Sequence, residues 1–273
     1  MANTTTTVVA QAINYFYDRT MLKAARPLLL HTKWAQVRDI PRNSGTAIKF
    51  RRYSLLTANT TALSEGVTPS GTALAVTDVT ATVAEYGDYI TLTDALVLTT
   101  FDPILTESAD VLGQQAGNSL DQLCRDVIVA GTTIQYASTA SSRATVTASM
   151  KITRAEIREA VRTLQNNDAM KLTRMVNPSN GFNTSPLNAC FVGIVTENTL
   201  FDLKDAQGWV PVEEYASQKD VMEGEVGKVD EVRFVLTTNA KIFSSAGSGS
   251  IDVHATMILA ADYYVIKRVS GAS

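Results

Sequence analysis

The sequence predicts an α+β protein, and three features support this prediction. Two stretches with strand character, within 48–53 and 79–93, flank the polar segment "TANTTALSEGVTPSGTALAVTD" (57–78). A helical pattern over 103–130 is unusually long for a chain of 273 residues. The strands expected after this helix show neither an internal repeat nor a clear βαβ alternation, which is the pattern of an α+β fold.

The composition is that of a folded, soluble protein, with 45% hydrophobic and 19% charged residues. The start of the chain has neither a basic nor an apolar leader, and no apolar run approaches the roughly 18–20 residues that span a membrane. The chain is therefore expected to stay in the cytoplasm where it is made. The two cysteines, Cys124 and Cys190, are interpreted as small buried hydrophobes, because two isolated thiols make neither a disulfide framework nor a zinc site.

Positive charge is concentrated in the first fifth of the chain. Between Arg19 and Arg52 nine Lys or Arg residues accompany one acid, Asp39, so this stretch carries +8 and the remainder −11. The asymmetry indicates a polyanionic partner or contact with the acidic part of another copy, and a solvated basic face is the alternative. The basic residues that precede the first strand are Arg19, Lys23, Arg26, Lys33, Arg38 and Arg42.

The first elements expected along the chain are a helix and two strands. Apolar residues at helical spacing predict a helix over 11–25, and Pro27 ends it. Alternating residues predict strands over 48–53 and 79–83, and the strand pattern continues at 89–93.

The two strands would form a hairpin, and a hairpin alone in water is marginally stable. Its strands carry Arg51, Arg52, Tyr53 and many threonines rather than a one-sided apolar face that a helix would cover. We infer from this that the hairpin lies on another copy of the protein, in an assembly with heterologous contacts.

The long helix has recognisable start and stop signals. Asp102 is expected at the N-cap with Pro103 at the first helical position, and Gly131 is expected to end the helix. One face is predicted from residues at helical spacing. This face comprises Ile104, Leu105, Ser108, Val111, Leu112, Gln115, Ala116, Ser119, Leu120, Leu123 and Val127.

The second half of the chain mixes short helices with strands. Thr153 and Glu156 form a capping box at the start of a second helix, whose apolar face comprises Ile157, Ala160, Val161 and Leu164. A loop is expected over 177–186 and a flexible one over 244–250. Strands are expected over 190–195, 231–238 and 255–266, with a short helix over 196–204.

The residues that catalysis would need are scarce. His31 and His254 are the only histidines, and both are interpreted as packing, interface or strand residues rather than as bases or ligands. No Walker loop, GxGxxG or GxSxG motif occurs, and "GQQAG" (113–117) falls within the long helix. The adjacent acids Glu213-Glu214 and Asp230-Glu231 are interpreted as solvated charge. No catalytic, cofactor-binding or metal site is expected.

Several stretches resemble the major capsid proteins of tailed bacteriophages, and most closely the N4-like capsid family. They are residues 16–56, which include "RPLLLHTKWAQVRDIPRNSGTAIKFRRY" (26–53), "LSEGVTPSG" (63–71), "YGDYITLTD" (86–94), residues 102–132, and "GEVGKVDEVRFVLTTNA" (224–240). The resemblance runs from about residue 12 to the end of the sequence and is strongest over 16–132.

The resemblance implies the Hong Kong 97-type capsid fold. Its parts would be an N-terminal arm (1–45), an extended loop formed by the β-hairpin (46–93), a peripheral domain (94–177) with a spine helix (102–131), an axial domain (178–240) and return strands (241–273).

The resemblance also implies a function. The chain would be a structural protein that assembles with many copies of itself into the hexamers and pentamers of an icosahedral head, enclosing double-stranded DNA. It would need no cofactor and no membrane, would be assembled in the host bacterial cytoplasm and would end in the virion. Scaffold, portal and decoration proteins are further candidate partners. Contacts between subunits are expected at Arg51, Arg52, Tyr53, Glu65 and Val67. The alternatives are the shell of a non-viral nanocompartment, or an enzyme.

Overall fold

The computed structural model describes residues 29–40, 47–54, 56–63, 65–66, 68–99, 104–176, 184–215 and 221–269. Contacts divide the chain into two compact units. One unit comprises Met1–Gln36 and Tyr89–Ile266, and the other comprises Val37–Asp88 and Lys267–Ser273. The predicted helix over 11–25 and the predicted cap at Asp102 and Pro103 lie outside the described residues.

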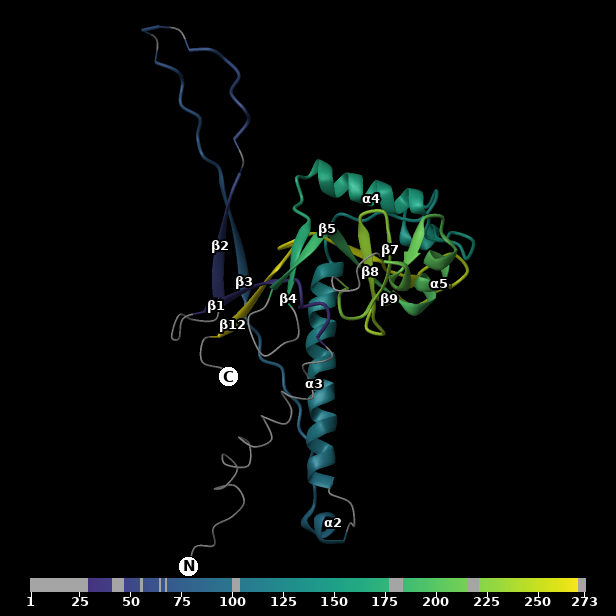
Figure 1. Ribbon diagram of the computed structural model, residues 1–273. Helices are drawn as coiled ribbons and strands as arrows, with labels where there is room; N and C mark the ends of the chain where they lie inside the picture. Colours follow the sequence, from purple (N-terminus) through teal and green to yellow (C-terminus); the bar gives the residue numbers. More distant parts are fainter. Residues whose placement is uncertain are drawn as a thin grey trace, which may run out of the picture. The chain divides into compact units, whose positions relative to one another are not determined.

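The predicted hairpin is present in the smaller unit. Strands β2 (Ala47–Tyr53) and β3 (Val76–Thr82) pair antiparallel over seven residue pairs, from Ala47 opposite Thr82 to Tyr53 opposite Val76 (Figure 1). One further main-chain hydrogen bond, from Ser54 N–H to the carbonyl of Ala75, continues the ladder toward the tip. The β-branched and aromatic residues of both strands favour this extended pairing.

The prediction of a strand over 89–93 is wrong. Residues 83–93 belong to no strand, and the next element is the short helix α2 (Asp94–Thr99). The sequence pattern is that of a strand, but a strand also needs a neighbour for its main-chain hydrogen bonds, and no described segment forms a ladder with 83–93.

The long helix is α3 (Ile104–Val129), and its 26 residues correspond to about 39 Å at 1.5 Å per residue (Figure 1). The predicted face of this helix is only partly correct, since Leu112, Ala116 and Leu123 are half-buried but no residue of that face is fully buried. The buried residues of the helix are Ala109, Gly113, Gly117 and Asp121, spaced four apart, whereas Leu105, Val111, Leu120 and Val127 are exposed. Helix α3 therefore packs mainly through a stripe that includes small residues and allows close approach, and several larger apolar groups stay at the surface. The helix ends close to Gly131, as predicted, although Gly131 does not have a positive φ.

A six-stranded sheet forms the centre of the larger unit. Its strands are β4 (Leu172–Val176), β5 (Thr184–Val195), β6 (Trp209–Pro211), β7 (Glu225–Val229), β8 (Val232–Leu236) and β11 (Met257–Leu259). The order is β11-β5-β8-β7-β6, and β4 pairs with the first part of β5. Strands β5 and β8 are parallel, and the other pairs are antiparallel.

Strand β5 begins earlier than the sequence predicts. Thr184, Ser185 and Pro186 were expected in a loop, but they pair with residues of β4, from Thr184 opposite Val176 to Pro186 opposite Arg174. The loop was predicted because these residue types often form turns. The strand extends through them because β4 pairs with them in an antiparallel ladder. The remainder of the predicted loop, 177–183, lies outside the described residues.

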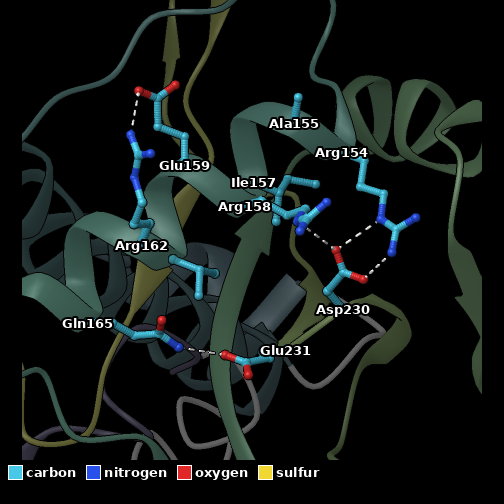
Figure 2. Close-up of a pocket in the computed structure, with 10 residues that line it drawn as sticks. Arg154, Ala155, Ile157, Arg158, Glu159, Arg162, Gln165, Asp230 and Glu231 are labelled. Atoms are coloured by element: carbon cyan, nitrogen blue, oxygen red, sulfur yellow. Dashed lines mark hydrogen bonds and ion pairs between the residues drawn. The ribbon is translucent and has the colours of Figure 1, made fainter.

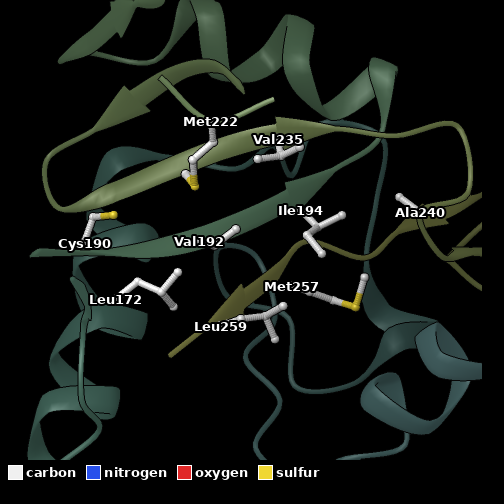
Figure 3. Packing of buried hydrophobic residues seen from close by; sticks show 9 residues of the cluster. All are labelled: Leu172, Cys190, Val192, Ile194, Met222, Val235, Ala240, Met257 and Leu259. Carbon is white, nitrogen blue, oxygen red and sulfur yellow. The ribbon is translucent and has the colours of Figure 1, made fainter. Parts of the chain in front are cut away.

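Residues 190–195 of β5 and 232–235 of β8 are buried on both faces of the sheet, which explains their continuous apolar sequences. On one face, Cys190, Val192, Ile194 and Val235 belong to the cluster shown in Figure 3. The cluster also contains Leu172, Met222, Ala240, Met257 and Leu259. Leu30, Trp34, Ile128, Val129, Ala261 and Tyr263 pack at its edge.

The opposite face of the sheet is covered by two helices. Helix α4 (Arg154–Asn166) contributes Ile157 and Val161, and α5 (Glu197–Asp205) contributes Leu203, to a second cluster around Phe234. Gly193 makes this packing feasible, because a Cβ atom there would lie 2.5 Å from the Phe234 ring. The predicted capping box is confirmed, since Thr153 accepts from the Glu156 N–H and the Glu156 side chain accepts from the Thr153 N–H.

The remaining elements are short. Strands β9 (Ile242–Phe243) and β10 (Val253–His254) flank the predicted loop over 244–250, which is fixed to the segment before α4 by a hydrogen bond from Ser248 N–H to the carbonyl of Val146. Two 3₁₀ turns lie at Arg143–Thr145 (η2) and Val212–Glu214 (η3). Strand β12 (Val265–Val269) pairs with β1 (Gln36–Ile40). The predicted last strand is thus split into β11 and β12 by a turn at Asp262, whose φ is 54°.

Candidate functional site

The hairpin tip is the most exposed part of the described chain. Every described side chain from Tyr53 to Thr80 is exposed, including Leu56, Leu63 and Leu74. Leu63 is 72% exposed, although leucine is a residue type that folding usually buries. The side-chain hydrogen bond described within the tip joins Thr61 N–H to Asn59 Oδ1 over 3.0 Å. The tip thus presents a long apolar and polar surface that its own chain does not cover.

The register divides the hairpin into two faces, and neither is wholly apolar, because Arg52 and Thr77 share the face of Phe50 and Val79. Phe50 lies opposite Val79, and Ala81 shares their face because it is two residues from Val79. The other face carries the pairs Lys49–Thr80, Arg51–Asp78 and Tyr53–Val76. Val79 is 53% exposed, so apolar surface is available on the strands as well as at the tip.

The predicted contact residues have different outcomes. Arg51 makes an ion pair with Asp78 across the hairpin, with 3.9 Å between Nε and Oδ1, and both side chains remain largely exposed. Tyr53 and Glu65 are exposed as well. The Arg52 side chain and Val67 lie outside the described residues.

Of the basic residues predicted to contact a partner, Lys33 is described fully. Its Nζ lies 2.7 Å from Glu223 Oε2, so part of its charge is balanced within the same unit. Arg38 lies in β1, but its side chain is outside the described part of the chain. Arg19, Lys23, Arg26 and Arg42 are outside it too. A role for this basic segment stays a prediction.

A buried polar cluster surrounds Asp121 of helix α3. Asp121 and His31 are both fully buried. One carboxylate oxygen accepts from the main-chain N–H groups of Leu30 (2.9 Å) and His31 (2.8 Å). The other lies 2.8 Å from His31 Nδ1 and 3.3 Å from Asn239 Nδ2.

The electrostatics of this cluster favour the ionised carboxylate. Burial acts to raise the pKa of Asp121, but the hydrogen bonds from the His31 ring and main chain, with that from Asn239, outweigh it and hold the pKa below its usual value. The buried carboxylate also raises the pKa of Cys124, after the larger effect of burial. Tyr263 and Tyr264 direct their hydroxyl groups to the carbonyl of His31 and have raised pKa values, chiefly because they are buried.

Sequence reasoning missed Asp121 and Asn239 as partners of His31. The available signal was the position of Asp121, which lies four residues after Gly117 in the stripe that begins at Ala109 and Gly113. A charged residue in line with small residues on a helix indicates a buried carboxylate with a specific partner. The partner itself is 90 residues away in the sequence and could not be inferred from spacing.

A pocket beside helix α4 is lined by ion pairs (Figure 2). Arg154 holds Asp230 through two hydrogen bonds of 2.9 and 2.5 Å, and Arg158 approaches the same carboxylate at 4.0 Å. Glu231 binds Gln165 and Lys171 at 2.9 and 2.8 Å. The pKa of Asp230 is lowered, first by its hydrogen bond with Arg154. Asp230 and Glu231 are both exposed, which agrees with their interpretation as solvated charge, and both also make surface ion pairs.

The remaining histidine has no acid in contact with it among the described residues. His254 Nδ1 lies 3.0 Å from Thr196 Oγ1, and its Nε2 lies 3.4 Å from Asn198 Nδ2. Cys190 is buried, and burial raises the pKa of its thiol to about 11, so it is a poor nucleophile at neutral pH. Cys124 is only partly buried.

The described residues hold no cluster of three or more His, Cys, Asp or Glu side chains that could bind a metal ion. A search of the same residues for a helix with the length and apolar character to span a bilayer found none.

The fold is similar to that of solved phage capsids. The capsid of Ralstonia phage GP4 matches with a TM-score of 0.63 and 14% identity, over 86% of this chain and 74% of that chain. The capsid of cyanophage P-SCSP1u matches with a TM-score of 0.54 and 13% identity, over 89% of each chain. The head structure of Helicobacter pylori bacteriophage KHP40 matches with a TM-score of 0.53 and 16% identity, over 80% of this chain and 57% of that chain.

In sequence, neither a protein-family model nor a curated protein matches the chain. The similarity is thus one of fold, since every identity quoted is at or below 16%. The chain has the α+β fold of phage capsid proteins, of the Hong Kong 97 type, as the sequence resemblance implied.

Proposed function

We propose that this chain is the major shell protein of a tailed bacteriophage head. The observation that carries the proposal is the hairpin, whose described side chains from Tyr53 to Thr80 are all exposed although several are large and apolar. In a chain with a capsid fold, such a surface is explained if neighbouring copies cover it. Leaving this much apolar surface in water would otherwise promote aggregation.

The proposal extends to the parts of the subunit. Helix α3 would be the spine of a peripheral domain over 94–177, and the hairpin would be the extended loop within 46–93. Residues 178–240 would form an axial domain at the centre of each hexamer and pentamer, with 241–273 returning from it and 1–45 forming an arm. The quoted sequence stretches favour the N4-like group among tailed phages.

The proposed role is structural, without catalysis or a cofactor. The histidines and acids described above are engaged in packing and ion pairs, and this supports a structural role. Double-stranded DNA would be enclosed by the shell, which would be assembled in the host cytoplasm and become part of the virion. Scaffold, portal and decoration proteins are candidate partners in assembly.

Electron microscopy combined with sedimentation tests the proposal. We expect the purified full chain, or a lysate that expresses it, to give closed particles of megadalton mass. Particles made in infected cells should protect DNA from nuclease. A strictly monomeric chain under assembly conditions would overturn the proposal, and particles that enclose an enzyme instead of DNA would favour a nanocompartment.

A further inference from the structure

The buried cluster around Asp121 joins the segment before β1 to the middle of helix α3. The segment 29–36 has few other attachments in the described structure. Leu30 and Trp34 are only partly buried at the edge of the sheet cluster, and the ion pair from Lys33 to Glu223 is exposed. The hydrogen bonds from Lys33 N–H to Leu30 O and from Ala35 N–H to Thr32 O are local turns. They shape the segment without holding it to the helix.

The remaining hydrogen bonds from this segment to the rest of the unit involve the Asp121 carboxylate and the C-terminal tyrosines Tyr263 and Tyr264. The Asp121 carboxylate accepts from two main-chain N–H groups and faces the His31 ring. The His31 carbonyl accepts from Tyr263 and Tyr264, and Gln36 N–H binds the carbonyl of Tyr264 over 3.0 Å. Hydrogen bonds to an ionised group are stronger than neutral ones, so Asp121 is the main tether.

This tether is not fully satisfied. Because an ionised carboxylate can only accept, the His31 Nδ1 must carry the proton that it shares with Asp121. The other ring nitrogen, Nε2, is buried and has no hydrogen-bond partner in the described part of the chain. A buried polar atom without a partner costs free energy, which lowers the net stability of the closed arrangement.

We propose that the His31–Asp121 pair is a latch, which holds residues 29–36 on helix α3 and can open while the sheet remains folded. The buried residues of the two clusters of the sheet all lie outside 29–36, and this segment contributes only the partly buried Leu30 and Trp34 at the edge of the first cluster. Local opening of a weakly packed segment beside a stable core is a common property of proteins. If the proposed function is correct, the latch would let the chain that precedes β1 change its contacts between a free and an assembled subunit.

Hydrogen exchange measured by mass spectrometry tests the latch in the full chain. We expect Asp121→Asn to accelerate exchange in a peptide covering 29–36 at least tenfold. The amide that replaces the carboxylate brings N–H groups against the His31 and Asn239 donors. A peptide covering 191–195 of β5 should change less than twofold. Asp126→Asn is the matched control on the same helix, because Asp126 is largely exposed in its ion pairs with Arg125 and Lys241. It should leave both peptides unchanged.

A second pair of variants separates the hydrogen bond from packing and serves if Asp121→Asn fails to fold. His31→Ala removes the ring donor, whereas His31→Asn keeps a side-chain N–H near the position of Nδ1. We expect His31→Ala to accelerate exchange over 29–36 at least tenfold and His31→Asn to restore it to within about threefold of the wild type. Light scattering would confirm the same oligomeric state for every sample.

The proposal is overturned by unchanged exchange over 29–36 in the Asp121 and His31→Ala variants. Equal acceleration in both peptides would also overturn it, because the pair would then support the whole fold. Equal exchange over 29–36 in His31→Ala and His31→Asn would also overturn it, because the hydrogen bond from the His31 side chain would then make no difference. None of these results depends on whether the chain forms shells, so the latch and the proposed function can fail separately.

Discussion

At the residue scale, the carboxylate of Asp121 has the most specific environment in the described chain. It is fully buried on helix α3 and is surrounded by donors from segments that lie far apart in the sequence. The groups that face it are the His31 ring, Cys124, and the hydroxyl groups of Tyr263 and Tyr264, with Asn239 as a neutral donor. A residue held in this way links stability to pH.

The lowered pKa of Asp121 predicts the direction of that link. A carboxyl whose pKa is depressed on folding contributes stability above its ordinary value of about 3.8, and this contribution is lost as the pH falls through the lower, folded value. We therefore expect Asp121→Asn to lower the free energy of opening of residues 29–36 at pH 7 by at least about 1.4 kcal/mol, which corresponds to the tenfold faster exchange expected above. The difference from the wild type should shrink below about pH 4. Hydrogen exchange over 29–36 at several pH values, corrected for the intrinsic rate at each pH, measures both, and a difference that stays constant from pH 7 to 3 would contradict the account.

The N-cap of helix α4 gives a second prediction at this scale. Thr153→Ala removes the acceptor for the Glu156 N–H and should cost about 1 kcal/mol of stability. Thr163→Ala is a suitable control, because Thr163 lies inside the same helix and its hydroxyl donates a hydrogen bond to the carbonyl of Glu159 in the preceding turn. Thermal or urea unfolding should show a loss for the first variant alone. Equal losses of stability in the two variants would mean that the capping box adds no stability beyond that of an ordinary threonine inside the helix.

At the element scale, helix α3 shows what the sequence could and could not predict. Its existence and length follow from apolar spacing, and the structure agrees to within two residues at each end. Its buried face does not follow, because Ala109, Gly113 and Gly117 have little hydrophobicity to mark them. Strands likewise depend on their neighbours. The short strands β6 and β7 were not predicted, and the segment 89–93 has a strand pattern but pairs with no described strand. Local patterns specify elements, whereas faces and partners depend on the rest of the fold.

Substitutions on α3 test the corrected face. Ala109 is 4% exposed, so Ala109→Leu should overpack the contact and cost about 1–3 kcal/mol. Val127 is 71% exposed, so Val127→Ser should change the stability of the subunit by less than about 0.5 kcal/mol. Urea unfolding of the unassembled chain measures both. A larger loss of stability for Val127→Ser than for Ala109→Leu would support the face expected from sequence.

The hairpin is the other informative element. Its two strands were predicted from sequence, whereas the pairing that places Phe50, Val79 and Ala81 on one face emerged only from the register. Replacing residues 56–73 with Asn-Gly should keep the ladder from Ala47 to Tyr53, because Asn-Gly closes a tight hairpin. We expect this variant to unfold at the same urea concentration as the wild type but to form no stable particles. Normal particles with unchanged thermal stability would show that the tip buries no surface between copies.

At the scale of the whole molecule, the distribution of charge and apolar surface agrees with assembly. Several basic residues of the larger unit are paired within that unit, as Lys33, Lys171 and Lys241 are. Such exposed pairs contribute only about 0–1 kcal/mol each, so they shape the surface more than they stabilise it. Large apolar side chains are left exposed on the hairpin and on α3, and also at Leu98, Met170 and Phe201. The fold is that of phage capsids. In a shell, neighbouring copies would cover the exposed apolar surface of the hairpin and of α3.

A reconstruction of purified particles by electron cryomicroscopy, at a resolution that traces the chain, tests this account most directly. It predicts that residues 53–76 of one copy lie against a second copy and that Leu63 and Val79 lose most of their exposure there. A map in which these residues touch only their own chain or solvent would contradict it.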